Sequence, residues 1–380
     1  MTSVMIFLPD MRIGGAERVV LNLLSHWPEK LRSRLVPTLV LRRYAGGLCD
    51  QVPHWVDVVS LDLPPAGLWS SVASIWRLGL LMSHRRPTAI VAFHTATFAP
   101  VVLASRVGCP GTKTVVSVNE RPSTVWGGNL FQRLVFKLAI ILTDHFLTVT
   151  PANAQELRSS FGVPKRKITT LHNSVDIDKV LASQNAPTNH YAFERRDLPI
   201  VITAGRLTPR KRYDVLLRAA SLLAAKIKFT LAIIGDGELR EDLERLASTL
   251  GIADRTLFLG FVPNPWSYIS KASVFALSSD NEGFGNVLVE AMACGVPVVA
   301  TRAPYGPEYI ISNEENGLLV PVRDPEALAN AVRRLLVDQE LRKRCIEAGF
   351  KRASDFRAET VAQSFCAALE NIINEESCPS

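Results

Sequence analysis

The sequence predicts an α/β protein made of two Rossmann-like domains, each built on a parallel sheet. Its 380 residues exceed what one hydrophobic core usually holds, and they suit two α/β domains. Residues 4–8 form an apolar strand, Gly14-Gly15 a turn, and residues 16–25 a segment with helical apolar spacing. Residues 199–204 begin a second unit of this kind. Two strand–turn–helix openings predict two Rossmann-like halves.

The composition is that of a globular protein with free thiols. Apolar residues make up 47% and charged residues 21% of the chain, and no run reaches about 18 apolar residues. The first ten residues lack a basic stretch before their apolar run, so they read as a strand and not as a signal peptide. The cysteines are scattered without a C-x-x-C pair, which predicts a reducing cytosol and neither disulfides nor a zinc site. They are Cys49, Cys109, Cys294, Cys345, Cys366 and Cys378.

The net charge of +7 is concentrated in the first half of the chain. Residues 1–190 contain 20 Lys and Arg against 11 Asp and Glu, whereas the remainder contains 23 against 25. The basic residues do not alternate with stacking aromatics, which argues against a nucleic-acid groove. An anionic membrane surface or a pyrophosphate-bearing lipid is the expected partner. A solvated basic surface is the alternative.

The first half continues as alternating strands and helices. Further strands are predicted at residues 36–41, 56–61, 89–93, 114–118 and 145–150. Helices are predicted at residues 68–86, 129–142 and 151–161. The strand at 89–93 delivers His94 at its carboxyl end, where open α/β sheets bind ligands. His94 is therefore a candidate base or acceptor ligand, although a lone histidine is more often structural.

The predicted helix at 68–86 has two open interpretations. One face carries apolar residues that include Trp69 and Trp76, and Arg77, His84, Arg85 and Arg86 lie on or beyond the other. A basic amphipathic helix with two tryptophans suits contact with a membrane interface. Packing inside the first domain accounts for the same pattern equally well.

The second half repeats the α/β alternation. After 199–204, strands are predicted at 229–234, 257–261, 275–277, 298–300 and 316–320. Helices are predicted at 238–250, 266–273, 286–294, 325–336, 339–353 and 358–373. Arg206 and Lys211, five residues apart in the turn after the first of these strands, can converge on a diphosphate.

The most informative stretch runs from residue 278 to residue 308. Glu282 and Glu290 lie eight residues apart, on either side of Phe284, Gly285 and Asn286. Gly285 allows close approach of the backbone, and the helix that starts after it presents free N–H groups, an arrangement that attracts phosphate. The two carboxylates can flank such a ligand and accept hydrogen bonds from its hydroxyls.

This E-x-F-G-x-x-x-x-E spacing, followed by G-x-P-V-V-A-T, resembles the donor site of retaining glycosyltransferases with the GT-B fold. The similarity is to glycosyltransferase family four, the glycosyl transferases group one type. The segment G-R-L-T-P-R-K-R-Y resembles the family's G-R-L-x-x-x-K-G, with Arg212-Tyr213 in place of the glycine. The G-G-A-E-R loop at 14–18 and residues 150–176 also resemble the family, with Ser174 where glycine is usual.

The resemblance implies a donor site for a nucleotide sugar, UDP-linked by expectation. It implies that Glu290 binds the ribose hydroxyls and Glu282 the sugar hydroxyls, and that backbone groups near Val262 contact the nucleobase. The diphosphate would meet the Gly14-Gly15 loop, Arg206, Lys211 and the amides around Gly285, Asn286 and Val287, with Phe284 in the same loop. Glu282, Arg206 and Lys211 are the expected catalytic residues, and the anomeric configuration would be retained.

The acceptor side departs from the common family pattern. Many members carry a histidine after the strand at 114–118, whereas this chain has Asn119-Glu120-Arg121. That element resembles a subgroup acting on polyprenyl-diphosphate sugars, which implies Glu120 or His94 as the acceptor-side base and Arg121 as a phosphate contact. Asp176-Ile177-Asp178 spells D-x-D, but the family pattern explains it. No metal and no other cofactor is expected.

The expected enzyme is a metal-independent hexosyltransferase of glycan, polysaccharide or lipopolysaccharide biosynthesis. The resemblance implies an acceptor-side domain at 1–180, a linker at 181–198, a nucleotide-sugar domain at 199–357, and a helix at 358–380 returning to the first domain. The two sheets would face a central cleft. The acceptor would be a lipid-linked saccharide or glycolipid at the cytoplasmic face of the plasma membrane. A soluble-acceptor transferase, a UDP-sugar epimerase and a non-catalytic binding subunit are the alternatives.

Overall fold

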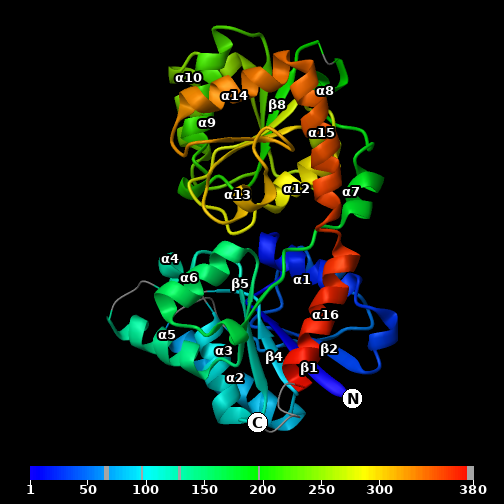
Figure 1. Ribbon diagram of the computed structural model, residues 1–380, viewed down its shortest axis with the longest axis vertical. Helices are drawn as coiled ribbons and strands as arrows, with labels where there is room; N and C mark the ends of the chain where they lie inside the picture. The colour runs from blue at the N-terminus through cyan, green and yellow to red at the C-terminus, as the bar shows by residue number, and fades with distance from the viewer. Residues whose placement is uncertain (64–67, 96, 127–129, 196, 375–380) are drawn as a thin grey trace. The chain divides into compact units, whose positions relative to one another are not determined.

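A computed structural model describes residues 1–63, 68–95, 97–126, 130–195 and 197–374. The side chains of residues 68–71, 130, 131 and 195 are not described, so Trp69 and Cys378 of the sequence analysis lie outside the described part. The chain forms two compact units (Figure 1). The first comprises Met1–Ser174 with Ala358–Ser380, and the second comprises Val175–Arg357.

The first unit is a seven-stranded parallel sheet in the order β3-β2-β1-β4-β5-β6-β7. Its strands are β1 (Thr2–Leu8), β2 (Leu35–Leu41), β3 (Asp57–Ser60), β4 (Ala89–Ala92), β5 (Lys113–Val118), β6 (His145–Thr148) and β7 (Ile168–Thr170). Its helices are α1 (Gly15–Ser25), α2 (Leu68–Arg85), α3 (Phe98–Gly108), α4 (Pro122–Val125), α5 (Leu130–Leu142), α6 (Pro151–Phe161) and α16 (Ala358–Asn374). This strand order is that of a Rossmann fold.

The second unit is a six-stranded parallel sheet in the order β10-β9-β8-β11-β12-β13. Its strands are β8 (Ile200–Ala204), β9 (Thr230–Ile234), β10 (Thr256–Gly260), β11 (Val274–Leu277), β12 (Val298–Thr301) and β13 (Leu318–Val320). Its helices are α7 (Ile177–Ser183), α8 (Tyr191–Arg195), α9 (Tyr213–Ala224), α10 (Arg240–Thr249), α11 (Trp266–Ile269), α12 (Asn286–Ala293), α13 (Gly306–Ile310), α14 (Pro325–Val337) and α15 (Gln339–Ser354). The prediction of two parallel-sheet Rossmann-like domains is confirmed.

Both faces of the first sheet are covered by helices. Val4, Ile6 and Leu8 of β1 belong to the core on the side of α1 and α16, whereas Met5 and Phe7 belong to the core on the side of α2 and α3. This alternation follows from the two-residue period of a strand, and it explains why these strands read as uninterrupted apolar runs.

The C-terminal helix belongs to the first unit. Phe365 of α16 contacts the rings of Trp27 and Phe93, with ring centroids 6.1 and 5.7 Å apart respectively. Cys366 and Leu369 are buried in the same core, and α16 packs on α1. The chain therefore leaves the first unit at Ser174 and completes its core again from Ala358 onward.

The segment expected to be a linker, residues 181–198, differs from that expectation. It contains the end of α7 and all of α8, and it belongs to the second unit. Its polar groups bind the α11 region: Asn264 donates to Ser183 O at 2.8 Å, and Lys271 Nζ donates to Thr188 Oγ1 at 2.8 Å. The segment is therefore tied to the residues that flank α11.

Candidate active site

Two loops of the second unit meet at the carboxyl ends of neighbouring strands. The loop after β8 (205–212) and the loop after β11 (278–285) follow two adjacent strands of the sheet. The chain continues from β8 toward one edge of the sheet and from β11 toward the other, and ligands usually bind at such a point in this fold. Ser278 Oγ donates to Lys211 O at 2.9 Å, and Asp280 N donates to Arg210 O at 2.9 Å. These bonds hold the two predicted donor motifs side by side.

Lys211 and Glu282 form a buried ion pair between these loops. The ammonium of Lys211 donates to Glu282 Oε1, which also accepts from Ser279 Oγ at 2.7 Å. Burial alone would raise the pKa of Glu282, but the charge of Lys211 and the hydrogen bonds from Lys211 and Ser279 outweigh it and lower that pKa. Glu282 is therefore an ionised acceptor at neutral pH.

The start of α12 presents backbone N–H groups beside this pair. Gly285 immediately precedes α12 and has φ +94°, a conformation that favours glycine. Asn286 and Val287 begin the helix and are half-buried. The first amides of a helix lack intrahelical partners and carry partial positive charge, so this position suits an anion.

The loop between Glu282 and α12 is fixed from beneath. Phe284 is buried against Phe356, with ring centroids 5.2 Å apart. Glu282 also forms a backbone bridge with Tyr305, and Gly306 N donates to Glu282 O at 3.3 Å. A Cβ on Gly306 would lie 1.8 Å from Phe284 O, so only glycine allows this approach.

Glu290 is buried on α12 and held by an aromatic side chain that no sequence motif assigned to the site. The indole N–H of Trp266 donates to Glu290 Oε2 at 3.1 Å. Trp266 begins α11, 24 residues away along the chain, and no motif linked it to Glu290. The sequence offered only one hint of this role, namely that an indole N–H donor follows shortly after Val262. Val262 itself is half-buried.

Arg206 contrasts with Lys211, because its side chain is exposed and no described residue pairs with it. It follows Gly205, whose φ is +154°, and a Cβ on Gly205 would lie 3.8 Å from Lys211 Nζ. The ammonium therefore lies over the backbone next to Arg206. This edge of the unit thus offers the exposed guanidinium of Arg206, the paired ammonium of Lys211 and the start of α12.

Arg212 explains the departure from glycine in the G-R-L-x-x-x-K-G pattern. Its φ of +50° and ψ of +44° place it in the left-handed region, which glycine adopts without strain. Its guanidinium contacts Asp214 at 2.8 Å and Asp280 at 3.1 Å, and Asp280 also pairs with Arg323 at 2.8 Å. This second charged connection between the two loops lies next to the Lys211–Glu282 pair in sequence and offsets the strain.

The remaining predicted site residues, Gly14, Gly15, His94, Glu120 and Arg121, belong to the first unit. Gly14 precedes α1, and Gly15 is its first residue, with open space around the position of a Cβ. They lie after β1, the strand beside which this sheet's connections change direction. The start of α1 thus lies at the ligand edge of its own sheet, with the Glu17 carboxylate close by, because a Cβ on Gly14 would lie 2.3 Å from Glu17 Oε2.

His94 follows β4 at this edge, and its Nδ1 is buried without a hydrogen-bond partner among the described residues. Burial raises the pKa of Glu17 on α1, and the nearby His94 acts in the opposite direction. The loop that carries Glu120 is tied to the loop after β4, because Asn119 Nδ2 donates to Phe93 O at 2.8 Å. The two candidate bases therefore follow neighbouring, connected strands.

Arg121 is exposed and lies 3.6 Å from the carboxylate of Glu156 on α6. The backbone of Glu120 is held from the same helix, since Asn153 Nδ2 donates to Glu120 O at 3.4 Å. Both residues are thus supported by α6, which begins after a Thr150 cap.

The D-x-D residues have structural partners. Asp176 caps α7 by accepting from Lys179 N at 2.9 Å, and Asp178 pairs with Arg357 at 2.6 Å. Within the described ranges there is no cluster of three or more His, Cys, Asp or Glu that could hold a metal ion. Across the same residues, no helix combines the length and apolar character needed to cross a bilayer.

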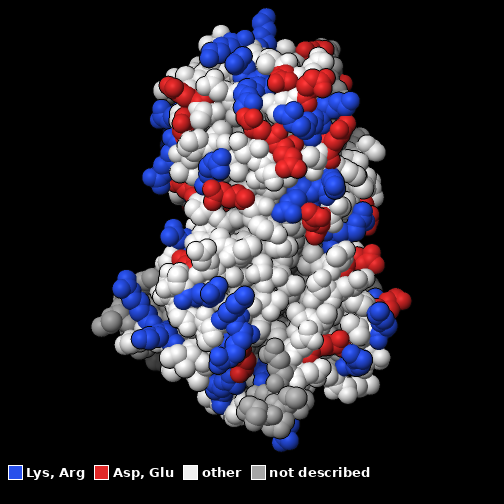
Figure 2. Space-filling view, viewed as in Figure 1, with Lys and Arg blue, Asp and Glu red and all other residues white. Residues whose placement is uncertain are grey.

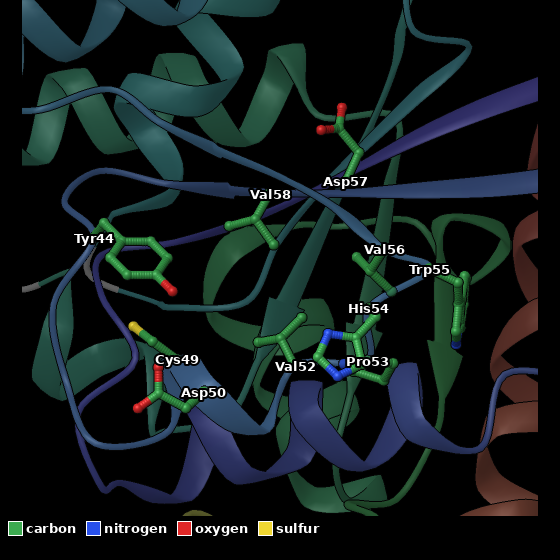
Figure 3. Close-up of a pocket in the computed structure, with 10 residues that line it drawn as sticks. All are labelled: Tyr44, Cys49, Asp50, Val52, Pro53, His54, Trp55, Val56, Asp57 and Val58. Carbon is green, nitrogen blue, oxygen red and sulfur yellow. The ribbon is translucent and has the colours of Figure 1, made fainter.

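A concavity of about 710 Å³ lies elsewhere in the first unit, along the segment from Tyr44 to Val58. Tyr44, Cys49 and Asp50 gather at one end of it, and Trp55 points away at the other (Figure 3). None of its lining residues is a predicted site residue. The ring of Trp55 instead stacks under the guanidinium of Arg32, 4.5 Å from the ring centroid.

Comparisons with known proteins match both halves of the chain. Residues 13–179 match the model of Glycosyltransferase Family 4, and residues 190–352 match that of Glycosyl transferases group 1. A solved structure of Anabaena HepE with UDP and glucose superposes with a TM-score of 0.82 at 20% identity, covering 97% of this chain and all of that one. The GT-B fold predicted from the sequence is confirmed.

Two relatives by sequence act in glycan assembly. The chain is 31% identical over 368 residues to N-acetylgalactosamine-N,N'-diacetylbacillosaminyl-diphospho-undecaprenol 4-alpha-N-acetylgalactosaminyltransferase of Campylobacter jejuni, covering 94% of this chain and 96% of that one. It is 33% identical over 228 residues to the lipopolysaccharide core biosynthesis glycosyltransferase LpsE of Rhizobium meliloti, covering 60% and 64%. The chain therefore belongs to the GT-B glycosyltransferases of family 4, group 1 type, and is a glycosyltransferase of glycan biosynthesis.

Proposed function

We propose that this glycosyltransferase moves a hexose or N-acetylhexosamine from a UDP-sugar to a lipid-linked saccharide or glycolipid, with retention of configuration. The observation that carries the donor half of the proposal is the Lys211–Glu282 pair beside the start of α12. This arrangement combines an ionised acceptor for sugar hydroxyls with donors for phosphate. HepE, which shares the fold, was solved with UDP and glucose, and this favours UDP as the nucleotide.

Each donor residue then has one task in the proposal. Glu290, oriented by Trp266, accepts hydrogen bonds from the ribose hydroxyls, and Glu282 accepts them from the sugar. Arg206, Lys211 and the first amides of α12 bind the diphosphate. The backbone near Val262 contacts the nucleobase.

Charge development decides how these groups accelerate transfer. When the bond between the sugar and the diphosphate breaks, negative charge grows on the departing phosphate oxygen. Arg206 and Lys211 stabilise that charge more strongly than the ground state, so they lower the barrier. We propose that these fixed cations make a metal ion unnecessary, and that transfer proceeds at full rate in EDTA.

The acceptor half of the proposal rests on the first unit and on the relatives. His94 and Glu120 follow neighbouring strands at the ligand edge of the sheet, and one of them takes the proton of the acceptor hydroxyl. Arg121 contacts an acceptor phosphate. The Campylobacter jejuni relative is named for a diphospho-undecaprenol acceptor and the Rhizobium meliloti relative for lipopolysaccharide core, which supports a lipid-linked acceptor. We propose that this acceptor lies at the inner face of the plasma membrane.

The first test measures UDP release from a panel of UDP-hexoses and UDP-N-acetylhexosamines, with and without polyprenyl-diphosphate-linked sugars. Arg206→Ala is expected to lower kcat about a hundredfold, the effect of removing one group that stabilises transition-state charge. Arg218→Ala, at an exposed arginine on α9, is the matched control and should leave kcat unchanged. NMR of the product reports whether the anomeric configuration is retained.

The alternatives give different results in the same assay. Transfer to small glycoside acceptors alone would indicate a soluble acceptor, and formation of an epimer or free sugar without acceptor would indicate epimerase or hydrolase chemistry. UDP binding without turnover of any donor would contradict catalysis by this chain. Acceptor-dependent release that survives Arg206→Ala at full rate would refute the proposed donor site.

A further inference from the structure

Two helices of the first unit expose stripes of large apolar side chains. On α2 these are Val72, Trp76 and Leu80, and on α5 they are Leu134, Leu138 and Ile141. The six side chains are between 48% and 69% exposed. Spacings of three and four residues place each set along one line of its helix. Each helix therefore buries one face in the unit and presents a second apolar line to its surroundings.

The two helices are connected through α3. Helix α2 packs closely on α3, and α3 packs on α5. The three helices lie together in the first unit (Figure 1). Their buried sides share one core, in which Leu78 and Met82 of α2, Phe98 of α3 and Ala139 of α5 are buried. The exposed lines thus belong to one helical layer.

The segment that contains this layer is rich in basic residues, although Arg85 and Arg106 pair with Asp57 and Asp144 just outside it. Residues 63–143, which span all three helices, contain eight Lys and Arg and a single acidic residue, Glu120. Arg133 and Lys137 are exposed on α5 beside its apolar line, and His84 and Arg85 end α2. Asp57 pairs with Arg85 at 2.9 Å, and Arg77 donates to Leu61 O at 2.6 Å. On the visible side of this unit near α5 and α6, blue side chains outnumber red ones (Figure 2).

We propose that α2 and α5 form a docking surface for an anionic lipid bilayer. Apolar side chains flanked by Lys and Arg are the chemistry of helices that lie in a membrane interface, and an indole such as that of Trp76 suits the boundary between acyl chains and headgroups. Anionic headgroups attract the basic residues of the layer. The inference rests on the proposed lipid-linked acceptor, and it names the surface that brings the first unit to that acceptor.

The structure combines features of the two interpretations of helix 68–86, packing inside the domain and contact with a membrane interface. The helix packs on α3 through one side, as an ordinary domain helix does, and exposes Trp76 on another. The second line, on α5, was not predicted as a lipid contact. The sequence indicated a mostly apolar helix with Arg133 and Lys137 on its surface, and it did not indicate which apolar side chains are exposed.

The test is sedimentation of the full chain with vesicles of phosphatidylglycerol and phosphatidylcholine, compared with vesicles of phosphatidylcholine alone. Replacing Trp76, Leu80, Leu138 and Ile141 by Ser is expected to lower partitioning at least about tenfold. Arg133→Glu with Lys137→Glu should do the same on anionic vesicles and abolish the lipid preference. Val337→Ser with Phe350→Ser, at exposed apolar positions of the second unit, is the matched control.

The outcomes separate this inference from the proposed function. Turnover of the donor with a water-soluble acceptor should be equal in wild type and all surface variants, because none of the substituted residues belongs to the candidate site. Vesicle binding that the apolar and charge variants leave unchanged would overturn the docking surface, as would absence of binding by the wild type. A dimer that the Ser variants convert to monomer, seen by sedimentation velocity, would assign the surface to a second copy and also overturn it. Vesicle binding without any transfer would leave the surface standing and contradict the function.

Discussion

Removing the partner of Glu282 should destabilise the second unit in a way that depends on pH. In Lys211→Met the carboxylate of Glu282 stays buried but loses its opposite charge. It either remains ionised and unpaired, which costs about 3–5 kcal/mol, or takes up a proton. Protonation at pH 7 costs at most about 3.7 kcal/mol, given 1.36 kcal/mol per pH unit above an ordinary pKa of about 4.3. We therefore expect a loss of about 3–4 kcal/mol at pH 7.

The sign of the pH dependence follows from the two folded states. In the folded wild type the pKa of Glu282 is lowered below its value in the unfolded chain. The stability that ionised Glu282 contributes is therefore present at pH values above the unfolded-state pKa, and it is lost as the pH falls through the folded-state pKa. In Lys211→Met the folded pKa rises above the unfolded value. The damage should then shrink to about 1 kcal/mol at pH 5, because protonation becomes cheap there.

Hydrogen exchange in increasing urea measures the free energy of unfolding of each unit separately. Peptides from β8 and β9 report the second unit, and peptides from β1 and β4 report the first as an internal control. Lys228→Met, at an exposed lysine, should show no pH-dependent loss, and Lys211→Met with Glu282→Gln should recover most of the stability at pH 7. A loss in Lys211→Met that is equal at pH 5 and pH 7 would refute the reasoning.

Substitutions at three further positions test the packing and hydrogen bonds of the site. Gly306→Ala should destabilise the second unit by about 1–3 kcal/mol, because the new Cβ would lie 1.8 Å from Phe284 O. Hydrogen exchange of β12 amides measures the loss of stability, and unchanged protection of these amides would contradict the prediction. Trp266→Phe removes the hydrogen-bond donor to Glu290. It should raise the KM for the nucleotide sugar about tenfold with little change in kcat. A fall in kcat alone would argue against a role of Trp266 in ground-state binding. Arg212→Ala should be less stable than Arg212→Gly by about 1 kcal/mol, because both variants lose the ion pairs but only glycine fits the left-handed backbone. The urea midpoints of the two variants measure this difference. A reversed order would show that the backbone strain at this position is negligible.

Most of the fold could be predicted because buried parallel strands are written as apolar runs. The runs at β1, β4, β8 and β11 were recognisable for that reason. The strand β7 was not predicted, since its three residues, Ile-Thr-Thr, are only half-buried and pair along one edge. Helix α9 was also not predicted, although its buried apolar residues have helical spacing.

The site was predictable where its residues are local to a motif and unpredictable where they meet through the fold. Glu282, Gly285 and Glu290 lie within nine residues of sequence, and their spacing alone indicated a ligand beside a helix start. Trp266 acts on Glu290 across 24 residues, and Arg212 and Arg323 converge on Asp280 from 68 and 43 residues away. Such partners follow from strand order and loop geometry, which single-sequence spacing does not contain.

The charge arrangement of the donor loops has a consequence for how a diphosphate would be bound. Lys211 is neutralised by Glu282 before any ligand arrives, so an anion meets a pair of little net charge at that position. The available positive charge is then the exposed guanidinium of Arg206 together with the helix start at Asn286. Arg206 should therefore dominate the first capture of the diphosphate, whereas the pair should matter more once the sugar is transferred and the departing phosphate gains charge. This separation predicts that Arg206→Ala raises the Kd for the intact nucleotide sugar more than Lys211→Met does.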